Sequence, residues 1–103
     1  SMLPPEVAVH KDRHRVVAIV APSPTDARAA RQRALFADVR KACEERDLVV
    51  VPVQGKAFAV LLVGKDGGEK NRWTVPVEPR TVFSLIDAMP MRRAEMKRRR
   101  SGE

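Results

Sequence analysis

Residues 57–68 read AFAVLLVGKDGG, an apolar run that passes directly into a glycine-rich turn. A continuous apolar run such as Ala57–Val63 is typical of a central strand that is covered on both faces. Gly64–Gly68, with Asp-Gly at its centre, predicts a tight turn, and Glu69–Val77 then returns as the partner strand. This strand pair decides the fold, and the remaining elements are placed around it.

Upstream of this pair, the sequence predicts a strand, a helix and a second strand. Val16–Val20 is a short buried strand, and the prolines and hydroxyl residues of Ala21–Asp26 end it. The stretch 26–46 lacks glycine and proline and carries an apolar face, so it predicts one long helix. Leu48–Val53 is the second strand, and Pro52 places it at a sheet edge because proline cannot donate a ladder hydrogen bond.

Downstream of the pair, a second helix begins at Glu78-Pro79, and Pro90 breaks the chain. The predicted order is β-α-β-β-β-α, an α/β (α+β) fold with about four strands. Three segments are expected: an N-terminal arm over residues 1–11, in which Ser1-Met2 is a cloning remnant, a domain over residues 12–90, and a basic C-terminal helix or tail over residues 91–103.

The chain has 103 residues and a net charge of +7, which fits one small basic domain. Residues 91–103 hold six basic residues against two acidic ones. Such a segment concentrates near any polyanion, whether nucleic acid, sulfated glycan or acidic lipid. The alternative interpretation is a solubilising helix end whose charges complement the helix dipole. The candidate polyanion-binding residues are Arg92, Arg93, Lys97, Arg98, Arg99 and Arg100.

Residues that could carry catalysis or bind a metal are few. Cys43 is the only thiol, which excludes an intrachain disulfide and a CxxC redox motif. It falls on the apolar stripe of the predicted helix, close to acidic residues, so we expect a buried structural cysteine. His10 and His14 are too few to hold a metal ion on their own. We therefore expect no catalytic residue, no metal and no cofactor.

The passage from the first strand into the helix is a candidate anion-binding loop. Ser23, Thr25 and Asp26 lie where backbone N–H groups and hydroxyls gather at a helix N-terminus. The alternative interpretation is an ordinary N-cap by Thr25 or Asp26. A minor alternative function is an enzyme that acts on an anionic substrate at the Ser23/Thr25 loop.

The C-terminal half carries a spaced pattern that resembles the P-DUDES family, a domain of unknown function. This domain occurs in small bacterial proteins and in vertebrate extracellular-matrix and sushi-repeat proteins. The likeness spans about residues 12 to 98 and is strongest between Phe58 and Met96. The residues that carry it are Phe58, Leu61-Leu62-Val63-Gly64-Lys65-Asp66-Gly67, Lys70, Pro76, Phe83, Leu85-Ile86-Asp87, Met89, Arg92-Arg93 and Glu95-Met96.

The resemblance implies a thioredoxin-like, peroxiredoxin-related fold, with a mixed sheet of about four strands flanked by helices. In that fold the redox cysteines would fall within Pro22–Ala27, where this chain has no cysteine. Without a thiolate there is no thiol–disulfide exchange or peroxide reduction by this route. We therefore expect a non-catalytic binding or interaction module. The family motif residues are Gly64, Lys65, Asp66, Gly67 and Asp87, and their alternative interpretation is structural, with Asp87 bonding to Arg92-Arg93 across the Pro90 bend.

The expected partner is a protein or a polyanion, and nucleic acid is one such polyanion without a specific indication for it. The longest apolar runs are too short to span a bilayer. The resemblance alone implies an extracytoplasmic location, periplasmic or secreted. The sequence predicts no oligomeric state.

One departure from the family pattern lies between the second and third strands. Family members carry a further helix there, but here only Gln54–Ala57 intervenes. Four residues extend roughly 13 Å, enough to cross one strand at a spacing of about 4.8 Å. The thioredoxin strand order is therefore possible. A plain hairpin between these strands and a native segment missing from the chain are the competing interpretations.

Overall fold

A computed structural model describes residues 3–102, so the prediction about Ser1-Met2 lies outside the described residues. Four strands form one sheet. They are β1 (Arg15–Ala21), β2 (Leu48–Gln54), β3 (Ala59–Val63) and β4 (Glu69–Trp73), in the order β2-β1-β3-β4. β1 runs parallel to β2 and antiparallel to β3, and β4 is antiparallel to β3. This is the thioredoxin-like mixed sheet predicted from the sequence, with β2 at an edge as Pro52 indicated.

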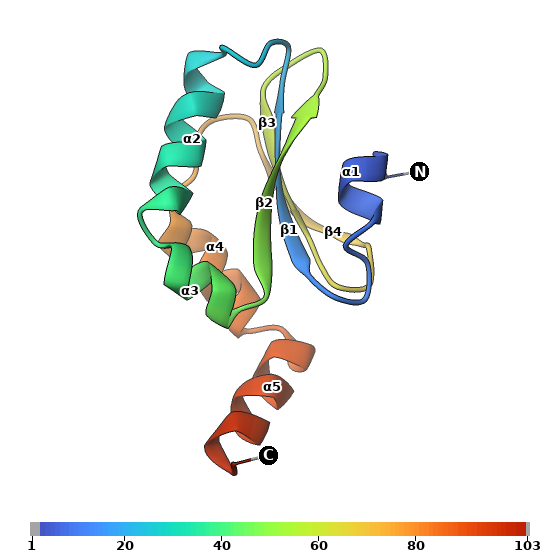
Figure 1. The fold of residues 1–103 in the computed structure, drawn as a ribbon, viewed down its shortest axis with the longest axis vertical. Helices are drawn as coiled ribbons and strands as arrows, with labels where there is room; N and C mark the ends of the chain where they lie inside the picture. The colour runs from blue at the N-terminus through green and yellow to red at the C-terminus, as the bar shows by residue number, and fades with distance from the viewer. Residues whose placement is uncertain (1–2, 103) are drawn as a thin grey trace.

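Within residues 3–102, five helices accompany the sheet: α1 (Pro5–Ala8), α2 (Ala27–Ala37), α3 (Arg40–Glu45), α4 (Pro79–Asp87) and α5 (Pro90–Arg100). Figure 1 shows α2, α3 and α4 on one face of the sheet and α1 on the other. α5 projects beyond the end of the sheet, at the pole where β1 and β2 begin. The sheet is thus covered by a full helical layer on one face and by a single short helix on the other.

The helix predicted over residues 26–46 is in fact two helices. α2 ends at Ala37, and Val39 takes a non-helical conformation with φ −125° and ψ 37° before α3 begins. No glycine or proline marks the break. Val39 is β-branched, and such residues lose side-chain freedom in a helix. The local preference for helix at Val39 is therefore weak, and tertiary packing determines its backbone conformation.

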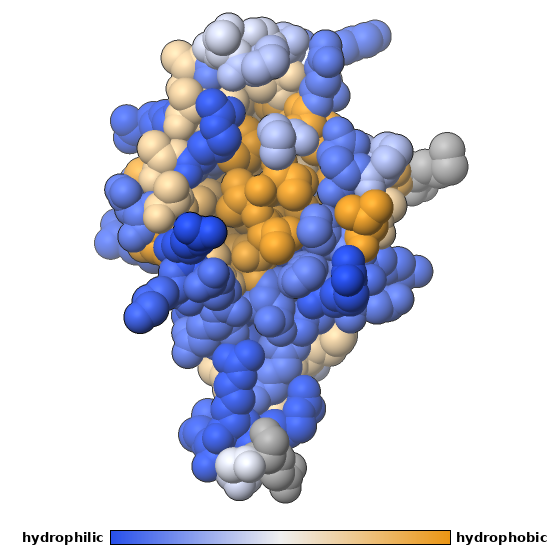
Figure 2. Space-filling model, in the orientation of Figure 1, coloured by the Kyte–Doolittle hydropathy of each residue, from blue (hydrophilic) through white to orange (hydrophobic). Residues whose placement is uncertain are grey.

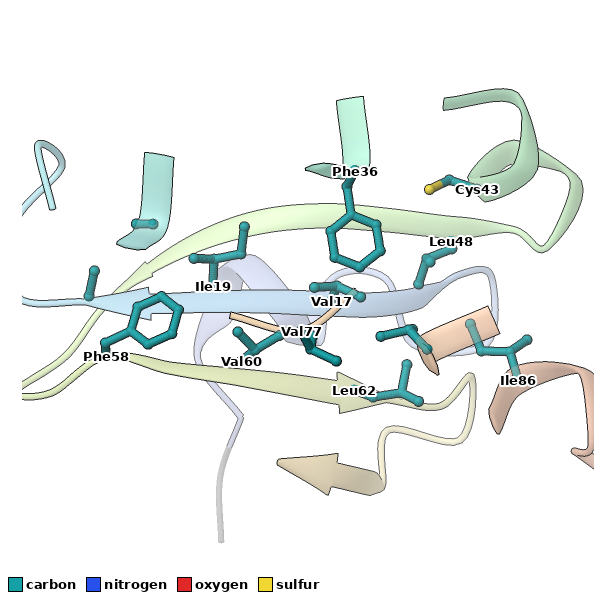
Figure 3. Close-up of a cluster of buried hydrophobic side chains, with 13 residues drawn as sticks. Val17, Ile19, Phe36, Cys43, Leu48, Phe58, Val60, Leu62, Val77 and Ile86 are labelled. Atoms are coloured by element: carbon teal, nitrogen blue, oxygen red, sulfur yellow. The ribbon is translucent and has the colours of Figure 1, made fainter. Parts of the chain in front are cut away.

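The main core lies between the sheet and the helical layer. Figure 3 shows Val17 and Ile19 of β1 in this layer, with Phe36 of α2 and Cys43 of α3 packed near them. Alternate residues of β1 face the other way, where Val16 and Ala18 pack against Val7 of α1. Because both faces of β1 are covered, almost the whole strand is buried, as expected for the centre of a sheet.

A buried glutamine fixes the segment between β4 and α4. The side chain of Gln32 is fully buried in α2 and donates to the Val77 carbonyl oxygen at 2.8 Å. It also accepts from the Val77 N–H at 2.7 Å. Both polar groups of Val77 are thereby satisfied inside the core, which explains why the strand predicted to reach Val77 ends earlier, at Trp73.

The connection from β2 to β3 settles the strand order. Only Gly55–Phe58 separates these strands, and they lie on opposite sides of β1. The chain therefore crosses the end of β1, and the hairpin interpretation is wrong. The Gly55 N–H donates to the Ala21 carbonyl oxygen at 3.0 Å, and a Cβ at this position would overlap the Val20 side chain.

We predict that Gly55→Ala lowers the free energy of unfolding by about 1–3 kcal/mol, because the added methyl group forces the crossing away from β1. Chemical denaturation measures this change. Gly68→Ala is the matched control, since its Cβ would meet only the ends of the Asp66 and Lys70 side chains, at 3.2 and 3.4 Å. Equal destabilisation by the two variants would contradict the close approach at Gly55.

Candidate functional site

The loop between β1 and α2 occupies the place of the redox site in a thioredoxin-like fold. Asp26 caps α2 by accepting from the N–H groups of Arg28 and Ala29, at 2.9 and 3.1 Å. The Ser23 hydroxyl lies 2.8 Å from the Thr25 hydroxyl and accepts from the Thr25 N–H at 3.1 Å. The hydroxyls and the carboxylate of the candidate anion loop are therefore engaged locally, and Asp26 plays the N-cap role of the alternative interpretation.

The charges at this loop are paired, because Asp26 and Arg28 form an ion pair at 3.0 Å. The hydrogen bond from the Arg28 side chain lowers the pKa of Asp26, and the two backbone donors add to this effect. Asp26 therefore stays ionised at neutral pH, and its charge is matched by that of Arg28. Arg28 in turn lies over the Phe58 ring, 5.0 Å from its centroid. The guanidinium is thus held by the protein's own groups.

The only thiol lies away from this loop. Cys43 is buried in α3, near the opposite end of the helical layer, which confirms the structural interpretation. Burial raises the pKa of the Cys43 thiol, and the nearby Arg46 charge offsets this only in part. A thiol in this environment is largely protonated at neutral pH and is a poor nucleophile.

A cluster of buried charges, here called the Glu95 cluster, joins α5 to the body. Glu95 accepts two hydrogen bonds from Arg15, both at 3.1 Å, and one from Lys65 at 2.8 Å. Lys65 also pairs with Asp47 at 2.9 Å. Arg15 is only 1% exposed. The start of β1, the start of β2, the turn after β3 and α5 thus meet at one charged junction.

A second part of the same cluster surrounds Asp87 at the end of α4. Arg46 donates to both carboxylate oxygens, at 3.1 and 2.9 Å, and Arg92 donates to one of them at 3.3 Å. Arg92 also donates to the Glu45 carbonyl oxygen at 3.1 Å and is 2% exposed. Arg92 therefore cannot face a polyanion, and its place among the surface candidates is corrected. Asp87 bonds Arg92 across the Pro90 bend, as the structural interpretation expected.

The turn at Gly64–Gly68, which carries the family motif residues, is held by contacts among its own residues and Lys70. Gly67 has a φ of +83°, which favours glycine, and Asp66 accepts from the Gly68 N–H at 2.9 Å. Asp66 also pairs with Lys70 at 2.9 Å. A Cβ at Gly64 would meet the Lys70 side chain at 2.6 Å. The turn thus presents Lys65 to the Glu95 cluster.

The helical-layer side of β2 is hollowed along its whole length, and we call this hollow the β2 groove. One part, of about 540 Å³, is lined by Phe36, Cys43, Leu48 and Val50, and its charged lining residues are Arg33, Arg40 and Glu44. The other part, of about 210 Å³, continues past Pro52 and Gln54 to Ser23. Arg33 borders both parts. Figure 2 shows an apolar patch over β2 between the helical layer and α1.

The other sequence candidates are more dispersed. Arg93, Lys97, Arg98 and Arg100 are exposed on α5, whereas the exposed Arg99 donates to the Glu45 carbonyl oxygen at 2.8 Å. His10 and His14 pair with each other through their Nδ1 atoms at 3.1 Å. Within residues 3–102, no three histidine, cysteine or acidic residues gather as a metal site, and no helix is long and apolar enough to cross a membrane.

Part of the chain is similar to known proteins. A family described as "Domain of unknown function (DUF4174)" matches residues 53–95, from the end of β2 to the middle of α5. The chain is also 38% identical over 55 residues to the Sushi repeat-containing protein SRPX of Rattus norvegicus. This second match covers 53% of this chain and 11% of the rat protein, so the chain spans about a tenth of that relative. Resemblance to a domain of unknown function, expected from the Phe58–Met96 pattern, is confirmed.

The family match ends at Glu95, whose ion-pair partners could not be predicted from the sequence pattern. Residues 53–95 include Lys65, Asp87, Arg92 and Glu95, which together form one side of the Glu95 cluster. Their partners Arg15 and Arg46 lie far upstream, so spacing along the chain could not pair them. The sequence held one indication of a buried ion pair: Arg15 is a charged residue directly next to a buried apolar strand.

We predict that Glu95→Gln lowers the free energy of unfolding by about 3 kcal/mol, because it leaves Arg15 buried without a carboxylate and Lys65 with Asp47 as its remaining acidic partner. Burial opposes ionisation of Glu95, but hydrogen bonds and charges from Arg15 and Lys65 outweigh it, so the pKa lies below the usual 4.5. The wild-type contribution is therefore present above pH 4.5 and is lost as the pH falls below it.

Denaturation curves between pH 7 and pH 2 measure this effect, and the variant should show a flatter loss of stability with acid. Glu69→Gln is the matched control, because Glu69 pairs with Arg72 at 2.8 Å on the exposed surface. That change should cost less than about 1 kcal/mol. An equal cost for the two variants would show that the Glu95 cluster does not stabilise the docking of α5.

Proposed function

We propose that this chain is a non-catalytic thioredoxin-like domain that acts as a binding module. The observation that carries the proposal is the chemistry of the loop after β1, where Pro22–Ala27 contains no cysteine and the polar side chains bond to one another. Burial of Cys43 in α3 supports the proposal further, because the chain has no other thiol that could replace the missing redox cysteines. The apolar β2 groove provides the surface that a binding module requires.

The proposal extends to family and location. The match over residues 53–95 and the similarity to a sushi repeat-containing protein support assignment to the P-DUDES domain. We propose an extracytoplasmic location on the same resemblance, with a protein as the partner. The family motif residues then serve the fold of the module, because Lys65 and Asp87 hold the Glu95 cluster together.

We predict that the purified domain neither reduces insulin disulfides nor consumes peroxide above the level of Cys43→Ala. The thiol should also react with iodoacetamide at least about tenfold more slowly in the folded domain than after denaturation. Its rate should rise as the pH increases, because burial raises the pKa and leaves little thiolate at neutral pH. Turnover that disappears in Cys43→Ala would overturn the non-catalytic proposal.

The basic helix α5 supports a second candidate function, the binding of a polyanion. Arg93, Lys97 and Arg100 are spaced by four and three residues and therefore share one helix face. Within residues 3–102, none of the three has a carboxylate within 4.0 Å. Glu95 and Arg92 hold the opposite side of α5 against the body, so this face is presented to solvent.

We predict that the triple variant Arg93→Glu, Lys97→Glu, Arg100→Glu elutes from heparin at much lower salt than the wild type. The affinity of the wild type for heparin or duplex DNA should fall steeply with salt, since each neutralised phosphate or sulfate releases counterions. Arg31→Glu with Arg80→Glu tests the effect of net charge elsewhere on the surface. Equal losses for the two sets would mean that net charge rather than α5 governs retention.

A further inference from the structure

The outer edge of β2 combines unpaired backbone, apolar side chains and cationic rims. We propose that this edge binds an extended segment of a partner protein in which apolar and acidic residues alternate, and that the segment pairs with β2 as a fifth strand. The inference rests on the proposed binding function and names the surface and the chemistry of its ligand.

The backbone hydrogen bonds show which groups of β2 face outward. The Arg15 N–H donates to the Asp47 carbonyl oxygen, and the Gly55 N–H donates to the Ala21 carbonyl oxygen, so Asp47 and Gly55 both face β1. Because successive residues of a strand alternate, the residues between them at even positions direct their backbone groups away from β1. Val50 therefore offers both N–H and C=O to a further strand, whereas Pro52 offers only its C=O.

The side chains of β2 define what the two faces of an added strand would meet. On the α1 side, Val49, Val51 and Val53 are half-buried and pack beside the second core cluster. On the other side, Leu48 and Val50 line the β2 groove. An added strand would place alternate side chains next to the three valines, where apolar residues are favoured.

The arginines at the rim of the β2 groove favour acidic side chains on the face of the added strand that meets this groove. Arg33 is exposed, and within the described residues it has no carboxylate within 4.0 Å. Arg40 has only a 3.8 Å approach to Glu44, and both side chains are largely exposed, at 84% and 67%. Acidic residues at alternate positions would reach these guanidiniums while their stems cover the apolar floor.

Charge also selects this occupant over a second copy of the chain. Pairing two β2 edges would bring Arg33 and Arg40 of both copies to the same groove, and each copy carries a net charge of +7. Like charges placed together oppose association. An acidic partner removes this repulsion, and the seven residues of β2 can pair with a segment roughly 23 Å long at about 3.3 Å per residue.

The test uses a fluorescein-labelled ten-residue peptide of alternating valine and glutamate, titrated with the full chain at low salt and followed by anisotropy. Two peptides serve as controls: one replaces glutamate by lysine, and the other keeps the composition but groups all valines before all glutamates. We expect saturable binding of the first peptide and at least about tenfold weaker binding of both controls.

The variants separate backbone pairing from charge. Val50→Pro removes the one outward N–H near the centre of β2 and leaves the bonds to β1, so it should weaken binding at least about tenfold, whereas Val50→Thr keeps the N–H and should bind within about twofold of wild type. Arg33→Glu with Arg40→Glu should weaken binding about tenfold or more. Arg31→Glu with Arg80→Glu makes the same charge change at exposed positions that do not line the β2 groove and should have little effect.

Each other outcome overturns the inference. Absence of binding, equal binding by the block peptide, or equal binding by Val50→Pro in a folded variant would exclude strand addition. Equal loss of binding in the Arg31→Glu, Arg80→Glu variant would show that net charge rather than the β2 groove attracts the peptide. Sedimentation that shows a dimer dissociated by Val50→Pro would assign the edge to a second copy. The proposed function is tested separately, because redox turnover would overturn it whether or not the peptide binds.

Discussion

The four-residue crossing at Gly55–Phe58 is the constraint on which the rest of the architecture depends. It carries the chain from one side of β1 to the other, and so short a link has no room for a helix on the way. Within the described residues, the face of the sheet opposite the helical layer is therefore covered by the short α1, with Val7 as its buried contact. β2 stays at the edge, with apolar side chains half-exposed on both of its faces.

The charges of this basic chain are divided between two uses. In the Glu95 cluster, Arg15, Arg46, Lys65 and Arg92 meet carboxylates and carbonyl oxygens, and in residues 3–102 no buried side-chain polar atom lacks a hydrogen-bond partner. Such a junction is costly to break but contributes little as an attraction for ligands, because each charge is already satisfied. Among residues 3–102, the exposed cations without a carboxylate within 4.0 Å include Arg33 on the groove rim and Arg93, Lys97 and Arg100 on the outer face of α5.

The sequence predicted the strands, the edge position of β2 and the turn at Gly64–Gly68, because these depend on local rules: apolar runs, proline without a donor and glycine in a turn. It failed at Val39, where packing rather than preference breaks the helix. It also placed Arg92 on the surface, because composition describes residues 91–103 as one basic segment. The alternative interpretation did pair Arg92 with Asp87, but only the fold brings Arg92 to Glu45 and joins Arg33 to the edge of β2.

An exposed apolar edge strand is a hazard that proteins usually limit with charge, proline or short length. This chain uses the first two, since Pro52 removes one outward donor and Arg33 and Arg40 stand at the rim. Neither measure closes the edge completely: the Val50 backbone stays free to pair, and the arginines repel a second copy but attract an acidic strand. Because the arginines treat strands of opposite charge differently, they also provide a basis for selecting a partner at this edge. In a fold whose redox position holds no cysteine, the proposed binding function therefore depends on this edge.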